Sequence, residues 1–112
     1  MKHLELFLLI VLISIIEYIG DSNFKIYART DKIYNLLIGL IAYVIMIIFL
    51  IYVLKNVNVI YVNGMWDGIS AIIGTLLAIL ILHETLSNYI QYLGLAFIII
   101  GIFVLNYGNI PY

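Results

Sequence analysis

The sequence contains no cysteine, and only 10% of its 112 residues are charged. Without cysteine the chain can form no disulfide, thiolate nucleophile or cysteine-ligated metal site. Its two histidines, His3 and His83, are too few and too far apart to predict a metal centre. The net charge is −1, and the absence of a basic patch with interleaved aromatic residues argues against nucleic acid as a partner. We expect no cofactor, no bound metal and no enzymatic activity.

The chain is also too apolar to fold in water. Hydrophobic residues make up 66% of it, and its 10% of charged residues compares with about 25% in a soluble domain. A domain of this length buries only about 60–70% of the surface that its unfolded chain exposes. The excess of isoleucine, leucine, valine and phenylalanine must therefore face lipid. We predict an integral membrane protein, expected in the plasma (inner) membrane.

Four apolar runs predict four transmembrane helices. Their predicted ranges are 4–24, 34–54, 59–82 and 89–105, within a single membrane domain over residues 1–112. Each run has close to the roughly 20 residues that cross about 30 Å of hydrocarbon. None of them alternates between apolar and polar residues, so strands are not expected. The predicted fold class is an all-α bundle of four transmembrane helices, with a polar connector starting after Phe24.

Basic residues divide almost evenly between the two ends of the predicted helices. Lys2 and Lys55 lie on the side of the amino terminus, and Lys25, Arg29 and Lys32 lie on the other side. An excess of lysine and arginine normally marks the cytoplasmic side. Two basic residues on one side and three on the other give almost no bias toward either orientation in the membrane. Both termini are therefore expected on one side, and the molecule is expected to insert in both orientations.

Glu17 lies inside the first apolar run, where a carboxylate costs several kcal/mol unless it faces a cavity or a partner. Ser14, Gly20, Asp21 and Phe24 are three, four or seven residues away and share one side of the helix with it. We interpret this side as a polar, functional face. The alternative is that Glu17 lies in the wetted interfacial zone and that Asp21 is a solvated residue at the helix end.

A second polar stripe follows one face of the third predicted helix. Its members have the spacing i, i+3, i+4, i+7 and i+11: Asn63, Trp66, Asp67, Ser70 and Gly74. Asp67 lies well inside the hydrocarbon, and the lysines and arginines that could pair with it all lie near helix ends. We therefore expect the third helix to face a polar cavity together with the first.

Aromatic residues suit such a cavity to an organic cation. Trp66 lies beside carboxylates, and an aromatic face attracts a cation by about 0.5–2 kcal/mol. Ordinary helix packing is the alternative for Trp66. Tyr43, in the middle of the second helix, offers a ring and a hydroxyl at matching depth. The predicted substrate-binding set is Asp21, Tyr43, Asn63, Trp66 and Asp67.

Small residues form a separate pattern. Gly64 and Gly68 begin a smooth stripe on the third helix, and Gly94 and Gly101 lie seven residues apart on the fourth. Such stripes allow helices to approach closely in lipid. Four short helices leave little interior in which to hide two or three acids, so we expect a homodimer. The fourth helix carries no charge and is the expected dimerisation helix.

Taken together, these residues resemble the small multidrug resistance family, the four-helix branch of the drug/metabolite transporter superfamily. The matching positions are Glu17, Gly20, Lys25, Tyr43, Trp66, Gly68, Gly94, Gly101 and Asn106. The match covers almost the whole chain, and the membrane glutamate together with the Trp-x-Gly of the third helix is its specific part. The resemblance implies an antiparallel homodimer that exchanges protons for organic cations, with Glu17 as the coupling residue and Tyr43 lining the site.

Some positions depart from the family pattern. Asn63 stands where the family usually has tyrosine, Ser70 replaces a glycine, and Asp21 and Asp67 are acids where the family usually has small or hydroxylic residues. The segment 83–87 looks more like the larger ten-helix members of the superfamily, and like small paired subunits that flip lipid-linked aminosugars. A flippase-like subunit is therefore the first alternative function, and a non-transporting membrane interaction protein is the second.

Overall fold

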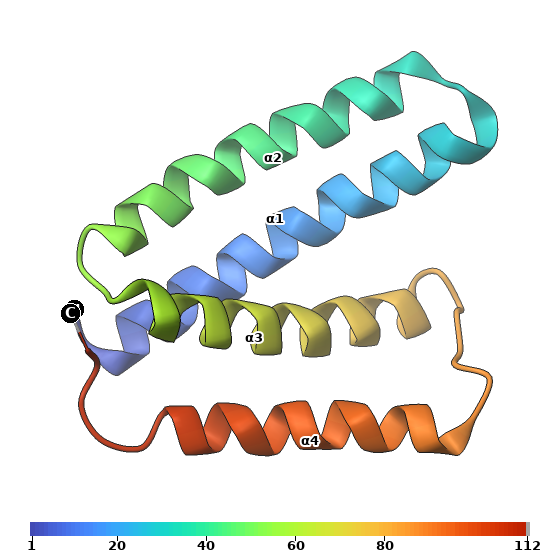
Figure 1. Ribbon diagram of the computed structural model, residues 1–112. Coiled ribbons are helices and arrows are strands. Elements are labelled where there is room, and N and C mark those ends of the chain that lie inside the picture. The colour runs from blue at the N-terminus through green and yellow to red at the C-terminus, as the bar shows by residue number, and fades with distance from the viewer. Residues whose placement is uncertain (112) are drawn as a thin grey trace.

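The computed structural model describes residues 1–111, so Tyr112 lies outside the described part of the chain. The described residues form helices and connectors and contain no strand. The helices are α1 (His3–Thr30), α2 (Ile33–Leu54), α3 (Val59–Leu80) and α4 (Tyr89–Leu105), arranged as two hairpins (Figure 1). The chain thus has the all-α, four-helix fold that its hydropathy predicts.

The prediction that the first helix ends near Phe24 is wrong. α1 continues to Thr30, and the connector to α2 is only two residues long. With 28 residues, α1 is about 42 Å long, whereas the hydrocarbon core is only about 30 Å thick. Its last turns therefore continue into the interface, where hydroxyl and amide side chains such as Ser22 and Asn23 bond to carbonyls one turn back, at 2.8 Å. The hydropathy of the sequence therefore indicates where α1 leaves the membrane, whereas the helix itself continues to Thr30.

Asparagine side chains start the two later helices. Asn58 accepts hydrogen bonds from the backbone N–H of Ile60 at 2.9 Å and of Tyr61 at 3.3 Å. At the start of α4, Asn88 and Gln91 form a capping box. Such caps satisfy N–H groups that a helix leaves without partners at its first turn. The two caps fix where the chain re-enters each apolar segment.

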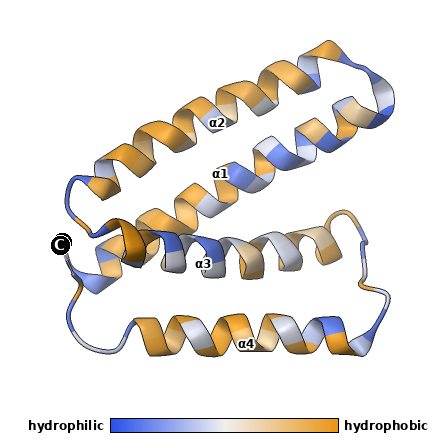
Figure 2. Cartoon of the chain, viewed as in Figure 1, coloured by the Kyte–Doolittle hydropathy of each residue, from blue (hydrophilic) through white to orange (hydrophobic). Residues whose placement is uncertain are grey.

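Three helices, α1 to α3, are long and apolar enough to cross a membrane, and α4 is a shorter apolar helix of 17 residues. In each of the three, only 22–28% of the most apolar stretch is buried within the chain. The visible side of α2 is coloured hydrophobic along most of its length, whereas α1 and α3 each carry hydrophilic patches (Figure 2). The apolar surface left exposed is what lipid or a second protein chain covers, and the fold is that of a four-helix membrane bundle.

The helices pack in the spatial order α2, α1, α3, α4, with α4 resting on α3. The molecule is consequently a slab of 46 × 36 × 18 Å. Its hydrophobic core joins α1 to α3 and includes the fully buried side chains of Leu6, Ile10, Ile13, Val62 and Met65. These residues lie toward the end that holds the two termini. Toward the other end, α1 and α3 diverge (Figure 1).

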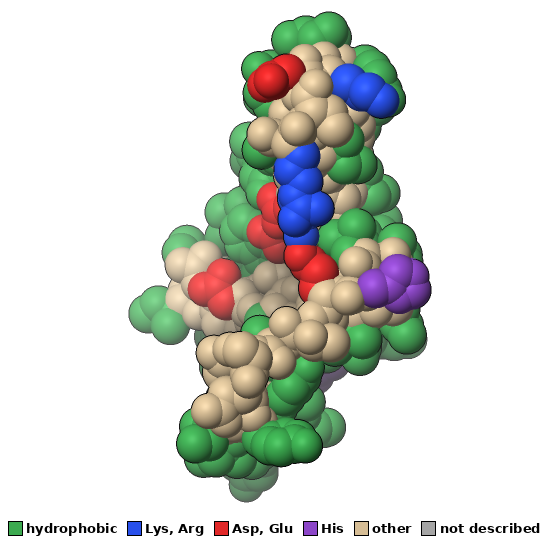
Figure 3. All heavy atoms as spheres, turned by 90° about the vertical axis from the view of Figure 1, so that its right-hand side faces the viewer, with side chains coloured by type: hydrophobic (Ala, Val, Ile, Leu, Met, Phe, Trp, Pro, Cys, Tyr) green, Lys and Arg blue, Asp and Glu red, His purple; other side chains and the backbone are tan. Residues whose placement is uncertain are grey.

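The two ends of the slab are held together differently. At the end with the termini, the C-terminal segment folds back, so that the N–H of Asn58 bonds to the carbonyl of Pro111 at 3.0 Å. The ring Nε2 of His3 also lies 3.1 Å from the carbonyl oxygen of Gly108. At the other end, charged side chains gather over the helix ends and connectors (Figure 3).

One ion pair bridges the two hairpins at that charged end. Lys25, on the extended part of α1, pairs with Glu84 in the connector between α3 and α4. It is the one ion pair within residues 1–111, and both side chains are partly exposed. The hairpins are therefore joined by apolar packing and the contact of the His3 ring with Gly108 at one end, and by a solvent-facing charge pair at the other.

Candidate intramembrane polar site

Glu17 lies on α1 where the core ends, and its side chain is directed toward α3. Its carboxylate lies near Ser70 of α3 and near enough to Asp21 and Asp67 to interact with both charges. The structure thus brings the polar faces of α1 and α3 together, as their spacing in the sequence predicts. Ser70 belongs to the predicted polar stripe of α3 but not to the predicted substrate-binding set, and the structure places it near Glu17.

Tyr43 brings α2 to the same cluster. Its hydroxyl donates a hydrogen bond to the Asp21 carboxylate. The Glu17 carboxylate is close enough to interact electrostatically with the Tyr43 hydroxyl. The Tyr43 ring also packs against Phe24, with ring centroids 5.3 Å apart and planes inclined by 41°. The two acids of α1 therefore lie near hydroxyl groups of different helices: Asp21 accepts from Tyr43 of α2, and Glu17 lies near Ser70 of α3.

Two glycines allow α1 and α2 to approach closely enough for these contacts. A Cβ at Gly20 would lie 2.7 Å from the Tyr43 ring and 3.4 Å from the carbonyl oxygen of Gly39. A Cβ at Gly39 would overlap the ring of Phe24. Sequence analysis assigned no role to Gly39, and its position as the single glycine in a continuous apolar helix was the available signal.

The remaining predicted substrate-binding residues lie on α3, and among them Asp67 is close to Glu17. Trp66 is partly buried and packs against the hydrophobic core, and its indole Nε1 is buried without a hydrogen-bond partner in the described chain. Asp67 is exposed and lines a groove of about 370 Å³ between α3 and α4. Asn63 is also exposed. The charge of Asp67 therefore interacts with that of Glu17, and the same residue also lines the groove between α3 and α4.

The glycines predicted for helix packing fall into two groups. A Cβ at Gly64 would lie 2.7 Å from Leu105, and one at Gly68 would lie 2.6 Å from Ile102. These two glycines are therefore where α4 rests on α3 within one chain. Gly94 and Gly101 have no other side chain or distant backbone within 4 Å of a Cβ position, so they lie on an open surface of α4.

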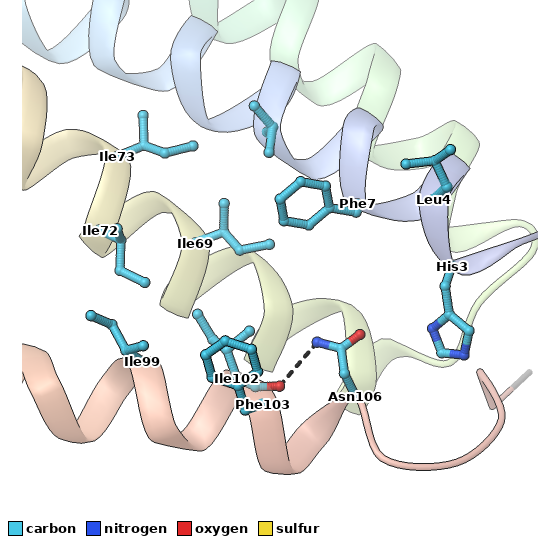
Figure 4. A pocket seen from close by; sticks show the side chains of 11 residues that line it. His3, Leu4, Phe7, Ile69, Ile72, Ile73, Ile99, Ile102, Phe103 and Asn106 are labelled. Atoms are coloured by element: carbon cyan, nitrogen blue, oxygen red, sulfur yellow. Dashed lines mark hydrogen bonds between the residues drawn. The ribbon is translucent and has the colours of Figure 1, made fainter.

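A separate, apolar groove lies away from the acids. It has a volume of about 680 Å³ and runs between α1, α3 and α4, where isoleucine and phenylalanine side chains form its walls (Figure 4). His3 and Asn106 lie at its polar end. The Asn106 amide is already engaged, because it donates to the carbonyl of Ile102 at 2.9 Å and accepts from Tyr61 at 3.1 Å.

The electrostatics of the acid cluster follow from what surrounds it. Glu17, Asp21 and Asp67 lie together on spanning helices, and the single ion pair of the described residues, Lys25–Glu84, leaves all three without a basic partner. Carboxylates inside a membrane that lack such a partner normally face a cavity or mark an ion pathway. The hydroxyls of Ser70 and Tyr43 offset only part of that charge. The cluster can therefore take up protons or a cationic ligand.

Comparison with known proteins identifies the family of the chain. The family model described as Small Multidrug Resistance protein matches residues 5–100, which is most of the chain and includes Glu17, Tyr43 and Trp66. No curated protein and no solved structure matches the chain. The family match confirms the resemblance that the sequence motifs predict. The chain belongs to the small multidrug resistance family of transporters and is a multi-pass integral membrane protein of the plasma membrane.

Proposed function

We propose that this chain is a proton-coupled antiporter that exports small organic cations, with Glu17 as the residue that couples the two. The observation that carries the proposal is the cluster of three carboxylates, Glu17, Asp21 and Asp67, with no basic partner among the described residues. A positive charge is what such a site lacks. Protons and cationic substrates both supply it, and they compete for the same carboxylate.

Coupling in this proposal is mutual exclusion at Glu17. A cation binds when the carboxylate has released its proton, and a proton that binds on the other side of the membrane expels the cation. Tyr43 and Trp66 would hold the apolar body of the cation through their ring faces. The additional charges of Asp21 and Asp67 favour a small, polar or doubly charged cation over a bulky hydrophobic one.

The proposed active unit is an antiparallel homodimer. One chain is a slab only 18 Å thick along its shortest dimension, and Asp21 and Asp67 are exposed on it. A second copy would supply the missing wall of the cavity and a second Glu17. The open glycine surface of α4, at Gly94 and Gly101, suits close contact between helices. The even distribution of basic residues supports insertion in both orientations.

The test is proton release on cation binding by purified protein in detergent. Glu17→Gln keeps the shape of the side chain but cannot release a proton, so we expect release and transport to be lost while folding and self-association persist. Glu5→Gln removes an exposed acid from the first turn of α1 and is the matched control, which should behave like the wild type. Undiminished release from Glu17→Gln, with loss in Asp67→Asn, would instead assign coupling to α3.

The apolar groove favours a second candidate function. A lipid-linked sugar flippase needs an apolar channel that opens sideways to lipid, and the groove between α1, α3 and α4 has apolar walls and borders the lipid-facing surface. In that function Glu17 would be dispensable. Unchanged transport activity of Glu17→Gln, together with loss of activity when Phe103 in the groove is replaced by a charged residue, would favour the flippase.

A further inference from the structure

The apolar groove between α1, α3 and α4 meets a polar space at the end of the slab that holds the two termini. The groove has a volume of about 680 Å³. The polar space has a volume of about 380 Å³ and is lined by residues 1–3 together with Asn109 and Ile110. His3 lines both spaces and lies at the polar end of the groove (Figure 4). The two spaces therefore share a side chain that has polar surroundings on one side and apolar walls on the other.

The groove is about as deep as one leaflet of a bilayer. Along α1 it extends from His3 to Val11, a rise of about 12 Å, and along α4 from Asn106 back to Ile99, a rise of about 10 Å. Half of a hydrocarbon core is about 15 Å thick. Between these limits the walls are isoleucine, leucine and phenylalanine side chains. The groove thus begins at the level of lipid headgroups and ends near the middle of the bilayer.

A lysine lines the polar space. Lys2 is exposed, directly precedes α1, and has no acidic partner within residues 1–111, whose one ion pair is at the opposite end of the slab. The acid nearest to it in the sequence, Glu5, is exposed and lines neither space. Basic side chains that flank a spanning helix attract anionic lipid headgroups. The charge at the mouth of the groove is therefore complementary to a phosphate at the membrane surface.

We propose that the groove and the polar space together bind one anionic phospholipid. An acyl chain lies along the groove, and Lys2 holds the phosphate, with His3 beside it. Apolar contact alone selects no particular lipid, since every acyl chain is as apolar as the side chains of the groove. Selection comes from the charge at the mouth. None of the three clustered acids lines the groove, so this inference is independent of the proposed antiport at Glu17.

A second copy of the chain is the other occupant to consider. The groove uses the face of α4 that carries Ile99, Phe103 and Asn106. Gly101 belongs to the open surface of α4 that suits contact between copies. It is two residues from Phe103, and so points about 160° away from it around the helix. A dimer formed through the glycine surface therefore leaves the groove open to lipid.

The test measures lipid selectivity at two positions of α4 by quenching of tryptophan fluorescence. In a Trp66→Phe background, which removes the native fluorophore, Phe103→Trp places a reporter in the groove and Phe97→Trp places one outside it. The two native side chains are similarly exposed, at 75% and 63%. Each protein is titrated in mixed micelles with brominated phosphatidylglycerol, or with brominated phosphatidylcholine, which has a phosphate but no net charge. Circular dichroism checks the helix content of each variant.

We expect the Phe103→Trp reporter to show about fivefold tighter binding of phosphatidylglycerol, which corresponds to roughly 1 kcal/mol for one lysine near the membrane surface. The Phe97→Trp reporter should show no preference. Lys2→Gln should abolish the preference in the groove. Lys55→Gln is the matched control and should retain it, because Lys55 is an exposed lysine at the same end of the slab that lines neither space. Native mass spectra of the wild type and the two lysine variants make the same comparison without the tryptophan changes.

Three outcomes would overturn the inference. Equal binding of the two lipids at Phe103→Trp would show that the groove selects no headgroup. Equal loss of the preference in Lys2→Gln and Lys55→Gln would show a general attraction to the surface. Quenching at Phe97→Trp with none at Phe103→Trp would show that protein covers the groove, as a second copy would. None of these outcomes affects the proposed antiport, which is tested separately by Glu17→Gln.

Discussion

Replacing Gly20 with alanine is expected to separate α1 from α2 and to displace Tyr43 from Asp21. The new Cβ would lie 2.7 Å from both Cδ1 and Cε1 of the Tyr43 ring, whereas carbon atoms pack favourably at about 3.5–4.0 Å. The ring has little freedom to turn away, because it packs against Phe24 at a centroid distance of 5.3 Å. Either the ring or the helix must shift by roughly an ångström, and the hydroxyl moves with it.

The expected magnitude combines two opposing terms. Overpacking of a tight contact costs about 1–3 kcal/mol. Alanine is a better helix former than glycine by about 1 kcal/mol, which offsets part of that cost. We therefore expect Gly20→Ala to lower the free energy of unfolding by up to about 2 kcal/mol. Gly74→Ala on α3 is the matched control, because nothing lies within 4 Å of its Cβ position and only the helix-forming term applies.

The assay is reversible unfolding in mixed detergent micelles, followed by the fluorescence of the single tryptophan. Cation binding is measured on the same samples, since displacement of Tyr43 should weaken it. Gly20→Ala should be less stable than the wild type, and Gly74→Ala should be equal to it or slightly more stable. Equal stability of the two alanine variants would refute the close approach of α1 and α2 at Gly20.

Three further predictions concern contacts outside the acid cluster. Gly101→Leu should weaken self-association, measured by crosslinking in lipid, because a bulky residue would be placed on the open surface of α4; unchanged crosslinking would exclude this surface as the interface. Reversing the charge of either Lys25 or Glu84 alone should lower stability by under about 1 kcal/mol, because the pair is exposed. Exchanging the two charges should restore that stability, and the effect of each single reversal should vanish at high salt. Tyr61→Phe should lower the free energy of unfolding by about 1 kcal/mol through loss of the 3.1 Å bond to Asn106, and an unaltered unfolding midpoint would show that bond to be unimportant.

Much of the fold follows from the sequence because lipid imposes a simple condition on a spanning segment. Long apolar runs must be helical, since their backbone groups find no partners in hydrocarbon. That condition says nothing about where a helix ends once it has left the membrane. The extension of α1 to Thr30 depends on local hydrogen bonds, such as those of Ser22 and Asn23, and on a left-handed residue, Asp31, at φ 57°. Hydropathy does not detect these features.

The candidate site was partly predictable for a related reason. Helical spacing places Glu17 and Asp67 on the polar faces of their helices, and a polar face in lipid must find a polar neighbour. Which hydroxyl meets which acid depends on the rotation and relative height of whole helices. For that reason the hydrogen bond of Tyr43 to Asp21, and the position of Ser70 near Glu17, required the structure. The function of Gly39 was likewise hidden, because it is defined by Phe24 on another helix.

The divergence of α1 and α3 makes the molecule a lever. Its fulcrum is the apolar packing that ends at Ile13, the last large side chain of α1 to be fully buried. Along the helix, Glu17 is about 6 Å beyond that fulcrum and Lys25 about 18 Å beyond it. A small tilt of α1 about Ile13 therefore moves Lys25 three times as far as it moves Glu17. A spectroscopic label near the connector would therefore detect tilts of α1 that displace the carboxylate itself too little to be observed.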